Sequence, residues 1–547
     1  MLKPEPIPDI PPDTQRIAHA AFPKGTTITK LRDAFYTVYE DADFAALFPT
    51  RGQPALAPWR LALITVFQFL ENLTDRQAAD AVRSRIDWKY TLCLELSDAG
   101  FDFSVLSEFR ARLLASNMEQ VLLDKLLERF TQLGLLKARG KQRTDSTHVL
   151  SSVRHLNRLE LVTETMRATL NALVDTAPDW LQSWMPVDWV ERYARRSEES
   201  RLPNSKAGRD RHALIVGDNG SALLDAARDS RAPEEVQLHP MVTTLEQVWE
   251  QQYERIDGRA KWRSASNFPP AGQRIESPYD TDARFNSKRG QGWSGYKVHL
   301  SETCDDDAPR FVTHVETTQS TVTDVDMTQV IHHCLQDKKL LPTDHIVDTG
   351  YISSALLVNT IQAFDLRLVG PPALDYSWQA RAGKGFDSSA FQIDWDKRRV
   401  TCPMGKTSVI WHETTKKGDA FCTAKFAFAD CFSCRERVHC TRTVRGPRQL
   451  TFLPRDQRES LQAARDQHGN VAWQAAYARR AGIEGTISEA VRSHGLRRSR
   501  YRGLSKTGLQ MIAVRAAVNV SRVVNWLDGL RPVSSRTLPL TRLGLIA

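Results

Sequence analysis

The sequence predicts an α/β protein in which a mixed sheet carries a large helical insertion and follows an all-α amino-terminal domain. Residues 143–150 are rich in β-branched side chains and follow a turn at Gly140, as expected for a strand. Residues 345–351 form a short apolar run that ends at an acid, before a glycine turn and a helical pattern from about Ser353. With 547 residues, the chain exceeds what one core usually supports, so we expect two or three domains.

The amino-terminal part divides into a Pro-rich lead at residues 1–30, expected to be flexible, and a helical domain at residues 31–125. Helical patterns cover residues 59–71 and 105–115. Between them, Thr74 and Gln77 form a capping box that opens another helix. The tight break between the first two helices is compatible with a DNA-contacting helix-turn-helix and equally with any small helical bundle.

The α/β core is assigned to residues 139–153 and 277–547. A charged, mostly helical insertion at residues 154–276 separates these two parts. The pattern then predicts strands at residues 294–302, 310–318 and 366–370, and a helix at residues 325–336. We expect Thr323 or Asp324 to cap that helix, in preference to Asp324 and Asp326 serving as metal ligands.

Three acids are candidate metal ligands. Asp145 and Asp348 lie on predicted strands, and the carboxyl ends of strands are where ligands bind in open α/β sheets. Tyr477, Arg480 and Glu484 fall at i, i+3 and i+7, which places them on one helix face. Converging carboxylates repel one another unless cations neutralise them, which indicates Mg²⁺ or Mn²⁺. Taken alone, the 477–484 segment fits an ordinary amphipathic helix equally well.

A basic loop follows Glu484 and is bounded by Gly495 and Gly503. The candidate DNA-contacting residues in and around it are Arg492, Arg497, Arg498, Arg500, Tyr501, Arg502 and Lys506. Six cations cannot be buried unpaired, so they are either solvated or face a polyanion. Their position beside the acids favours phosphate contact, with Tyr501 stacking on an exposed base.

A second insertion, at residues 375–455, contains most of the eight cysteines. Cys402-Pro-Met-Gly-Lys is similar to a zinc knuckle, and three further thiols follow at Cys431, Cys434 and Cys440. In a cytosolic chain this spacing favours one structural Zn²⁺ over disulfides. Cys422 and His439 are reserve ligands. The alternative interpretation is a group of buried free thiols.

The composition favours a polyanionic partner, because the net charge is +9 and the isoelectric point is about 9.1. The amino terminus is Pro-rich rather than apolar, which argues against a signal peptide. The most apolar run, residues 61–70, is far shorter than a membrane span. We therefore expect a cytoplasmic protein without a membrane partner.

Five short motifs accompany the three acids in a specific order. They are Thr144-Asp145-Ser146-Thr147, Gly295-Tyr296-Lys297-Val298-His299, Asp348-Thr349-Gly350-Tyr351, Ile483-Glu484-Gly485-Thr486-Ile487-Ser488 and His494-Gly495-Leu496-Arg497-Arg498-Ser499-Arg500-Tyr501-Arg502-Gly503. In this combination the chain resembles the DDE transposases of bacterial insertion sequences, in particular the branch numbered eleven eighty-two. Residues 35–114 resemble the helical domain that often precedes such cores. The family pattern ends with a Lys where this chain has Val491, so the adjacent Arg492 is expected to contact phosphate instead.

The resemblance implies a ribonuclease-H-like sheet and an enzyme that cuts and joins DNA. It implies two Mg²⁺ or Mn²⁺ ions held by Asp145, Asp348 and Glu484, with Tyr477 and Arg480 on backbone phosphates or a displaced base. The implied partners are the terminal inverted repeats of the transposon and target DNA, both double-stranded, bound by a homodimer in the bacterial cytoplasm at the nucleoid. Two rival functions stay open: a metal-dependent nuclease without strand transfer, and a non-catalytic repressor or domesticated transposase.

Overall fold

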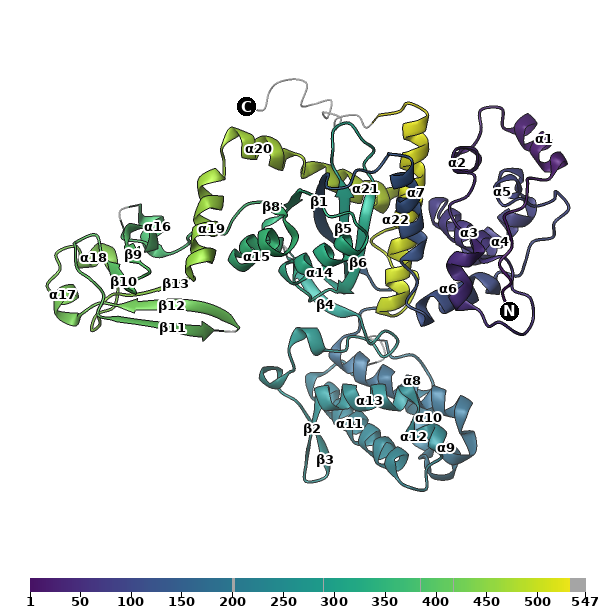
Figure 1. Ribbon diagram of the computed structural model, residues 1–547. Coiled ribbons are helices and arrows are strands. Elements are labelled where there is room, and N and C mark those ends of the chain that lie inside the picture. Colours follow the sequence, from purple (N-terminus) through teal and green to yellow (C-terminus); the bar gives the residue numbers. More distant parts are fainter. Residues whose placement is uncertain (199–201, 289, 384, 417, 532–547) are drawn as a thin grey trace, which may run out of the picture.

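A mixed sheet forms the centre of the computed structural model, which describes residues 1–198, 202–288, 290–383, 385–416 and 418–531 (Figure 1). The sheet has the order β4-β5-β1-β7-β8, and β6 also pairs with β5. Strand β1 pairs antiparallel with β5 and parallel with β7, which in turn pairs parallel with β8. The bounds are β1 (Lys141–Leu150), β4 (Arg284–Lys288), β5 (Gln291–Thr303), β6 (Val312–Gln319), β7 (Asp344–Val347) and β8 (Arg367–Val369). The predicted mixed α/β class is confirmed.

Four helices pack around this sheet. They are α14 (Asp324–Asp337), α15 (Ser354–Phe364), α21 (Ala481–His494) and α22 (Leu504–Leu527). Helix α14 begins at a capping box in which the Thr323 side chain and the Asp326 carboxylate bond each other's backbone N–H groups. The predicted cap is therefore confirmed. Helix α22, which the sequence analysis did not predict, is buried along most of its length.

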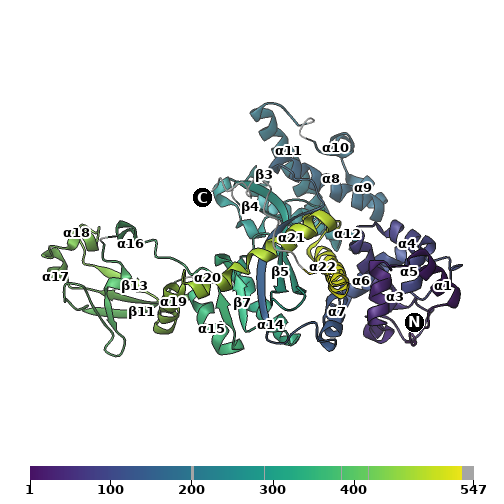
Figure 2. The same ribbon diagram turned by 90° about the horizontal axis from the view of Figure 1, so that it is seen from above.

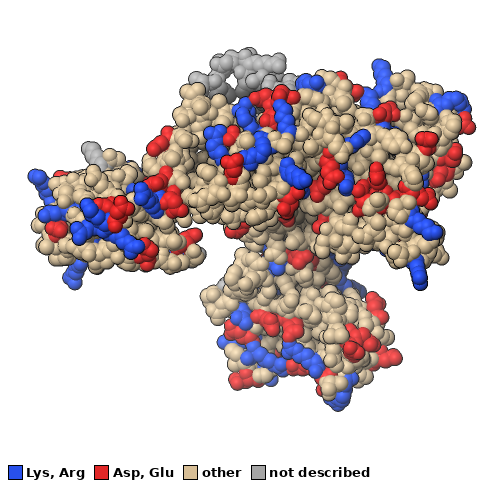
Figure 3. Space-filling model, viewed as in Figure 1, with Lys and Arg blue, Asp and Glu red and all other residues tan. Residues whose placement is uncertain are grey.

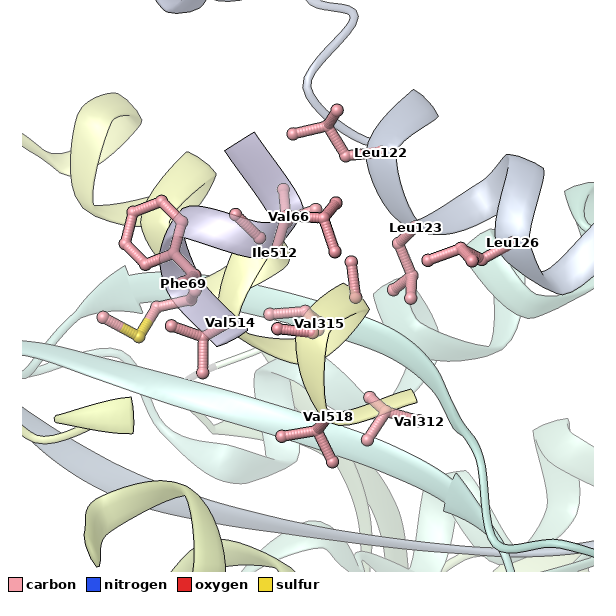
Figure 4. Packing of buried hydrophobic residues seen from close by; sticks show 14 of the residues in the cluster. Val66, Phe69, Leu122, Leu123, Leu126, Val312, Val315, Ile512, Val514 and Val518 are labelled. Atoms are coloured by element: carbon pink, nitrogen blue, oxygen red, sulfur yellow. The ribbon is translucent and has the colours of Figure 1, made fainter. Parts of the chain in front are cut away.

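The amino-terminal helices share one hydrophobic core with the central sheet. Figure 4 shows Val66 and Phe69 of α3 (Pro58–Leu70) lying beside Ile512 and Val514 of α22. Leucines of α7 (Val121–Gln132) and the β6 residue Val315 extend the same cluster. Almost every side chain of α3 is buried, because α22 covers a face that would be exposed in an isolated bundle. The amino-terminal helices therefore pack directly against the α/β core and share its hydrophobic interior.

The first 30 residues are not the flexible lead that was expected. They contain helix α1 (Pro12–Ala21), which begins with a proline at its first position, where the missing N–H is not needed. The buried Thr14 hydroxyl donates a hydrogen bond to the Leu94 carbonyl, and this contact ties α1 to the domain. The other elements here are α2 (Thr27–Phe35), η1 (Asp41–Leu47), α4 (Asp75–Ser84), α5 (Ile86–Thr91) and α6 (Ser104–Ala115). The predicted Thr74–Gln77 capping box opens α4.

Residues 154–276 form a separate lobe below the sheet in Figure 1, with a hydrophobic core of its own. Its helices are α8 (Arg158–Thr176), α9 (Pro178–Trp184), α10 (Val187–Tyr193), α11 (Lys206–Arg228), α12 (Glu234–Gln237) and α13 (Pro240–Gln252). Residues 253–256 were expected to continue a helix. They instead form β2 (Tyr253–Ile256), which pairs with β3 (Arg259–Trp262). Among the described residues, no helix is long and apolar enough to cross a membrane.

A third lobe projects from the side of the sheet that lies opposite the amino-terminal helices, as both ribbon views show (Figures 1 and 2). We call residues 386–452 the cysteine lobe. Its elements are η6 (Ser388–Ala390), β9 (Gln392–Asp394), β10 (Arg399–Thr401), β11 (Ile410–Lys416), β12 (Asp419–Lys425), α17 (Phe428–Phe432), α18 (Arg437–Cys440) and β13 (Gln449–Phe452). Helix α16 (Trp378–Ala382) precedes it. Helices α19 (Arg455–Gln467) and α20 (Val471–Ala478) return the chain to the sheet.

A buried carboxylate joins two strands of the sheet to two helices. Glu302 of β5 is fully buried and accepts a 2.7 Å hydrogen bond from Nε of Arg143 on β1. Its other oxygen accepts bonds from Thr486 of α21 at 2.6 Å and from Arg522 of α22 at 2.9 Å. Burial alone would raise the pKa of Glu302, but the attraction of Arg522 and Arg143 and the bond from Thr486 bring that pKa below its usual value. Glu302 is therefore ionised, and its ion pairs and hydrogen bonds hold β1, β5, α21 and α22 together.

Glu302→Gln should destabilise the folded protein by about 3–5 kcal/mol, because it leaves Arg143 buried without its counter-charge and removes one of the two carboxylates that pair with Arg522. The matched control is Glu489→Gln, since Glu489 pairs with the same Arg522 at 2.8 Å but is 40% exposed. Loss of that exposed partner should cost no more than about 1 kcal/mol. Denaturant melts followed by circular dichroism measure both. Equal destabilisation by the two variants would contradict the anchoring role.

Candidate active site

One guanidinium group touches all three of the acids singled out from the sequence. The Nη2 atom of Arg480 lies 2.8 Å from Oδ2 of Asp145 and 3.6 Å from Oδ2 of Asp348. Its Nη1 atom lies 3.2 Å from Oε1 of Glu484. Side chains more than 300 residues apart in sequence therefore meet at one point. The result is a cluster of three carboxylates around a single cation.

The three acids come from different elements and differ in exposure. Asp145 is in β1 and its side chain is 14% exposed, whereas Asp348, just after β7, is 44% exposed. Because β1 and β7 are parallel neighbours, their acids face the same end of the sheet. Glu484, in the first turn of α21, is 67% exposed. The site is closed at Asp145 and open to solvent at Glu484.

The electrostatics of the cluster suit a cation. Burial raises the pKa of Asp145, and Arg480 offsets this in part. Burial would lower the pKa of Arg480, but attraction by Asp145 and Asp348 outweighs it and raises that pKa. Carboxylate oxygens are the ligands that Mg²⁺ and Mn²⁺ prefer, so these residues fit a divalent ion if Arg480 withdraws.

A second layer of polar contacts holds the Asp145 strand in place. The Ser146 hydroxyl donates to Oδ1 of Asp324 at 3.1 Å, and Lys297 Nζ pairs with the same oxygen at 3.0 Å. Asp324 thus sits beside the acid cluster without touching Arg480. Lys297 belongs to the sequence motif at residues 295–299, but sequence spacing could not show that it pairs with Asp324.

The helix that carries Tyr477, Arg480 and Glu484 is divided in two. Helix α20 ends at Ala478 and α21 begins at Ala481, with 3₁₀-type bonds such as Ile483 N–H to Arg480 O across the junction. Both junction residues keep right-handed helical backbone angles, so the three side chains still share one face. The Tyr477 ring stacks on Trp473 with centroids 4.7 Å apart, a contact that the sequence analysis missed despite its i, i+4 spacing.

The basic loop is hydrogen-bonded to β1, the strand that carries Asp145. Leu150, the last residue of β1, donates its N–H to the Arg497 carbonyl and accepts a bond from the Ser499 N–H. Nε of Arg497 also donates to the Thr147 hydroxyl at 3.0 Å. Figure 3 shows Lys and Arg side chains gathered near α20 and α21. Of the six cations in and around this loop, all within the described residues, three are exposed and make no hydrogen bond, ion pair or ring contact through their side chains: Arg492, Arg498 and Lys506.

Three other loop residues are engaged by the protein itself. Arg500 donates to the Leu73 carbonyl at 2.6 Å and to the Asn72 side chain, which differs from the expected contact with DNA. The ring of Tyr501 packs beneath Arg110, whose Cζ atom lies 5.5 Å from the ring centroid, and its predicted stacking on a base stays a prediction. Arg502 lies over the Tyr279 ring at 5.1 Å. The break between α3 and α4 therefore packs against this loop. The Leu73 backbone carbonyl and the Asn72 side-chain oxygen both accept hydrogen bonds from the Arg500 guanidinium.

Two further groups of potential metal ligands lie away from the acid cluster. Cys402, Cys431, Cys434 and Cys440 line one cavity in the cysteine lobe. On β6 and α14, ligand atoms of His314, Glu316 and Cys334 lie within 4.8 Å of one another. The sequence analysis missed the second group, whose only signal is the i, i+2 spacing of His314 and Glu316 on a strand.

Comparison with known families gives two matches. The Transposase DDE domain matches residues 401–524, which include Arg480, Glu484 and the basic loop. A second family, described as a Transposase domain, matches residues 17–112, which cover most of the amino-terminal helices. Among curated proteins there is no significant match. The branch within the family stays a prediction. Both matches are transposase domains in one chain with the clustered acids, and together they support a DDE transposase of insertion-sequence type.

Proposed function

We propose that this transposase cuts the ends of its insertion sequence and joins them to target DNA at the cluster of Asp145, Asp348 and Glu484. The observation that supports this most directly is the simultaneous contact of Arg480 with all three carboxylates. We propose that two Mg²⁺ or Mn²⁺ ions take the place of the guanidinium. When bound, such ions activate the attacking oxygen and stabilise the leaving oxygen of an in-line displacement.

The sheet supports a ribonuclease-H-like assignment. Leaving β4 aside, its strands run in the order β6-β5-β1-β7-β8, antiparallel on one side of β1 and parallel on the other. This arrangement is the order that the family resemblance implies. It sets Asp145 on the central strand and Asp348 at the end of its parallel neighbour, with α21 delivering Glu484 from above.

The protein's own residues have the tasks of holding, orienting and neutralising. Asp145 is fixed by its burial and by the Ser146 N–H, which donates to Oδ1 at 2.8 Å. Asp348 is oriented by the Thr349 N–H at 2.7 Å. Once freed from the acids, Arg480 can pair with the phosphate beside the scissile bond. Tyr477, backed by Trp473, would contact the neighbouring backbone or a displaced base.

The same site can carry out cutting and joining in turn. In the first step water attacks phosphorus and the 3′-oxygen leaves. In the second, the freed 3′-hydroxyl attacks a target phosphate and another 3′-oxygen leaves, so no protein nucleophile is required. Transposition needs two ends, and we propose that a homodimer on double-stranded DNA brings the terminal inverted repeats together.

Strand transfer separates the proposal from a simple nuclease. Pre-cleaved duplex ends from the DNA flanking the reading frame, supplied with a supercoiled plasmid and Mg²⁺, should yield joined product. Cleavage of intact ends without any joining would favour a nuclease of the same fold. DNA binding with neither reaction would favour a repressor.

Asp145→Asn, Asp348→Asn and Glu484→Gln should each lower Mg²⁺-dependent end nicking by about 1,000-fold, because each loses several kcal/mol of charge stabilisation in the transition state. End binding should change little. Asp326→Asn is the control, since this acid caps α14 outside the cluster. Nicking assays and gel shifts on one labelled duplex measure both quantities. Near-normal nicking by any of the three variants would remove that acid from the site.

Arg480→Ala should tighten Mn²⁺ binding to the acids while slowing cleavage. The guanidinium competes with the ions in the free protein but is proposed to bind phosphate during the reaction. Loss of one hydrogen bond to a charged group corresponds to about 1.5–3 kcal/mol, or a roughly 10- to 100-fold slower reaction. Arg479→Ala is the matched control for Arg480→Ala, because Arg479 is the neighbouring arginine and pairs at 2.6 Å with the exposed Asp306. Calorimetric Mn²⁺ titration of both variants should separate them. Weaker ion binding by Arg480→Ala would contradict the competition.

The double substitution Arg492→Ala and Arg498→Ala should weaken binding to all duplex sequences. Each lost phosphate contact lowers the slope of log affinity against log salt by about 0.9, so we expect a change of about one to two units. Arg231→Ala, which removes an 88% exposed cation from the insertion, controls for net charge. Arg500→Ala should instead lower stability, because its side chain holds the α3–α4 break. An unchanged salt slope in the folded double variant would exclude these two cations from the interface.

A further inference from the structure

The cysteine lobe has a small hydrophobic core of its own. Among the described residues, its buried members are Phe391, Val400, Cys422, Ala424, Phe426, Leu450 and Phe452, and Cys402, Cys431 and Cys440 are among the partly buried residues that pack against them. The lobe projects away from the sheet, so the catalytic core does not cover it (Figure 1). Small units with such cores usually need a covalent or metal crosslink. No disulfide is present, since all eight cysteines are free.

Four cysteines face the same small cavity. Cys402 follows β10, Cys431 lies in α17, Cys434 follows α17 and Cys440 ends α18. All four line a cavity of about 30 Å³, whose other walls include Phe391 and Phe426. Cys422 and His439, the reserve ligands from the sequence, are not among its lining residues. Four of the five cysteines in the lobe therefore line this one cavity.

Backbone N–H groups point at two of these sulfur atoms. The Lys406 N–H donates to Sγ of Cys402 at 3.3 Å, across a tight turn in which Gly405 has φ +76°. The Arg448 N–H donates to Sγ of Cys431 at 3.4 Å. Such donors disperse negative charge on sulfur, and comparable outer contacts orient the ligands of metal sites.

The surroundings also favour thiolates once a metal is bound. Arg437 and Arg448 line the cavity together with the sulfurs, as do Lys406 and Asp430, which pair with each other at 3.4 Å. Among the described residues, no three of these sulfurs lie within 4.8 Å of one another, so the metal-free arrangement is wider than a zinc tetrahedron.

We propose that Cys402, Cys431, Cys434 and Cys440 bind one Zn²⁺ in a closed tetrahedral site that holds the cysteine lobe together. Four thiolates at Zn–S distances of about 2.3 Å would leave no open position, so the ion would be structural and not catalytic. The site joins the turn after β10 to α17 and α18. Its loss should loosen this lobe without disturbing the acid cluster.

Metal analysis of the full-length protein, purified without chelator, tests the proposal. We expect about one Zn per chain, falling to near zero in Cys402→Ser and Cys434→Ser. Cys422→Ser is the matched control, because this cysteine is buried in the same lobe but outside the cavity. Cys334→Ser tests the other cysteine-containing group, which it shares with His314 and Glu316. Zinc lost in Cys334→Ser and kept in Cys434→Ser would overturn the assignment.

Two measurements on the unmodified protein remain informative if the variants fail to fold. Chelation should raise amide hydrogen exchange within residues 386–452 while leaving β1 and α3 protected. Cobalt substitution should give the absorption of a tetrahedral four-thiolate centre. A zinc-free protein with four reactive thiols, or a mass lowered by disulfide formation, would overturn the proposal. Because neither measurement involves DNA cleavage, failure here would leave the proposed transposition chemistry intact.

Discussion

The buried charge of Glu302 is the constraint on which the geometry of the active site depends. Arg143, which pairs with Glu302, also donates to the Arg479 carbonyl at the start of α21. A β-carbon on Gly482 would lie 2.1 Å from the Arg143 guanidinium, so only glycine lets the helix settle this close to β1. One ion-paired network thus fixes the distance between the strand that carries Asp145 and the helix that carries Glu484.

The same reasoning explains why a cation belongs in the cluster at every stage. Asp145 is largely buried, and three ionised carboxylates at one point would destabilise the free protein. Arg480 supplies positive charge from the helix that also delivers Glu484, at i and i+4. The guanidinium of Arg480 keeps its proton throughout the physiological pH range. It therefore always places a positive charge beside the acids. The proposed divalent ions would exchange for a positive charge that is already there.

Sequence reasoning found the contributions that depend on local pattern and missed those that depend on packing. The strands of Asp145 and Asp348, the Thr74 and Thr323 caps and the mixed α/β class follow from periodicity and turn chemistry. Helix α22 was missed although it is apolar, because the basic loop before it dominated the pattern. The flexible lead was wrong because α1 depends on a contact with Leu94, 80 residues away. The role of Arg500 likewise depends on Asn72 and Leu73, which no spacing rule connects to it.

The gradient of exposure across the three acids has a mechanistic consequence. Asp145 is enclosed and held by the sheet, whereas Glu484 is mostly exposed and held only through α21. In the proposed mechanism, ions would therefore replace Arg480 from the Glu484 side, which is open to solvent. The basic loop lies beyond the carboxyl end of the same helix and is bonded to the end of β1. DNA held by that loop would approach the site from its open side, so binding the substrate and displacing Arg480 become linked events.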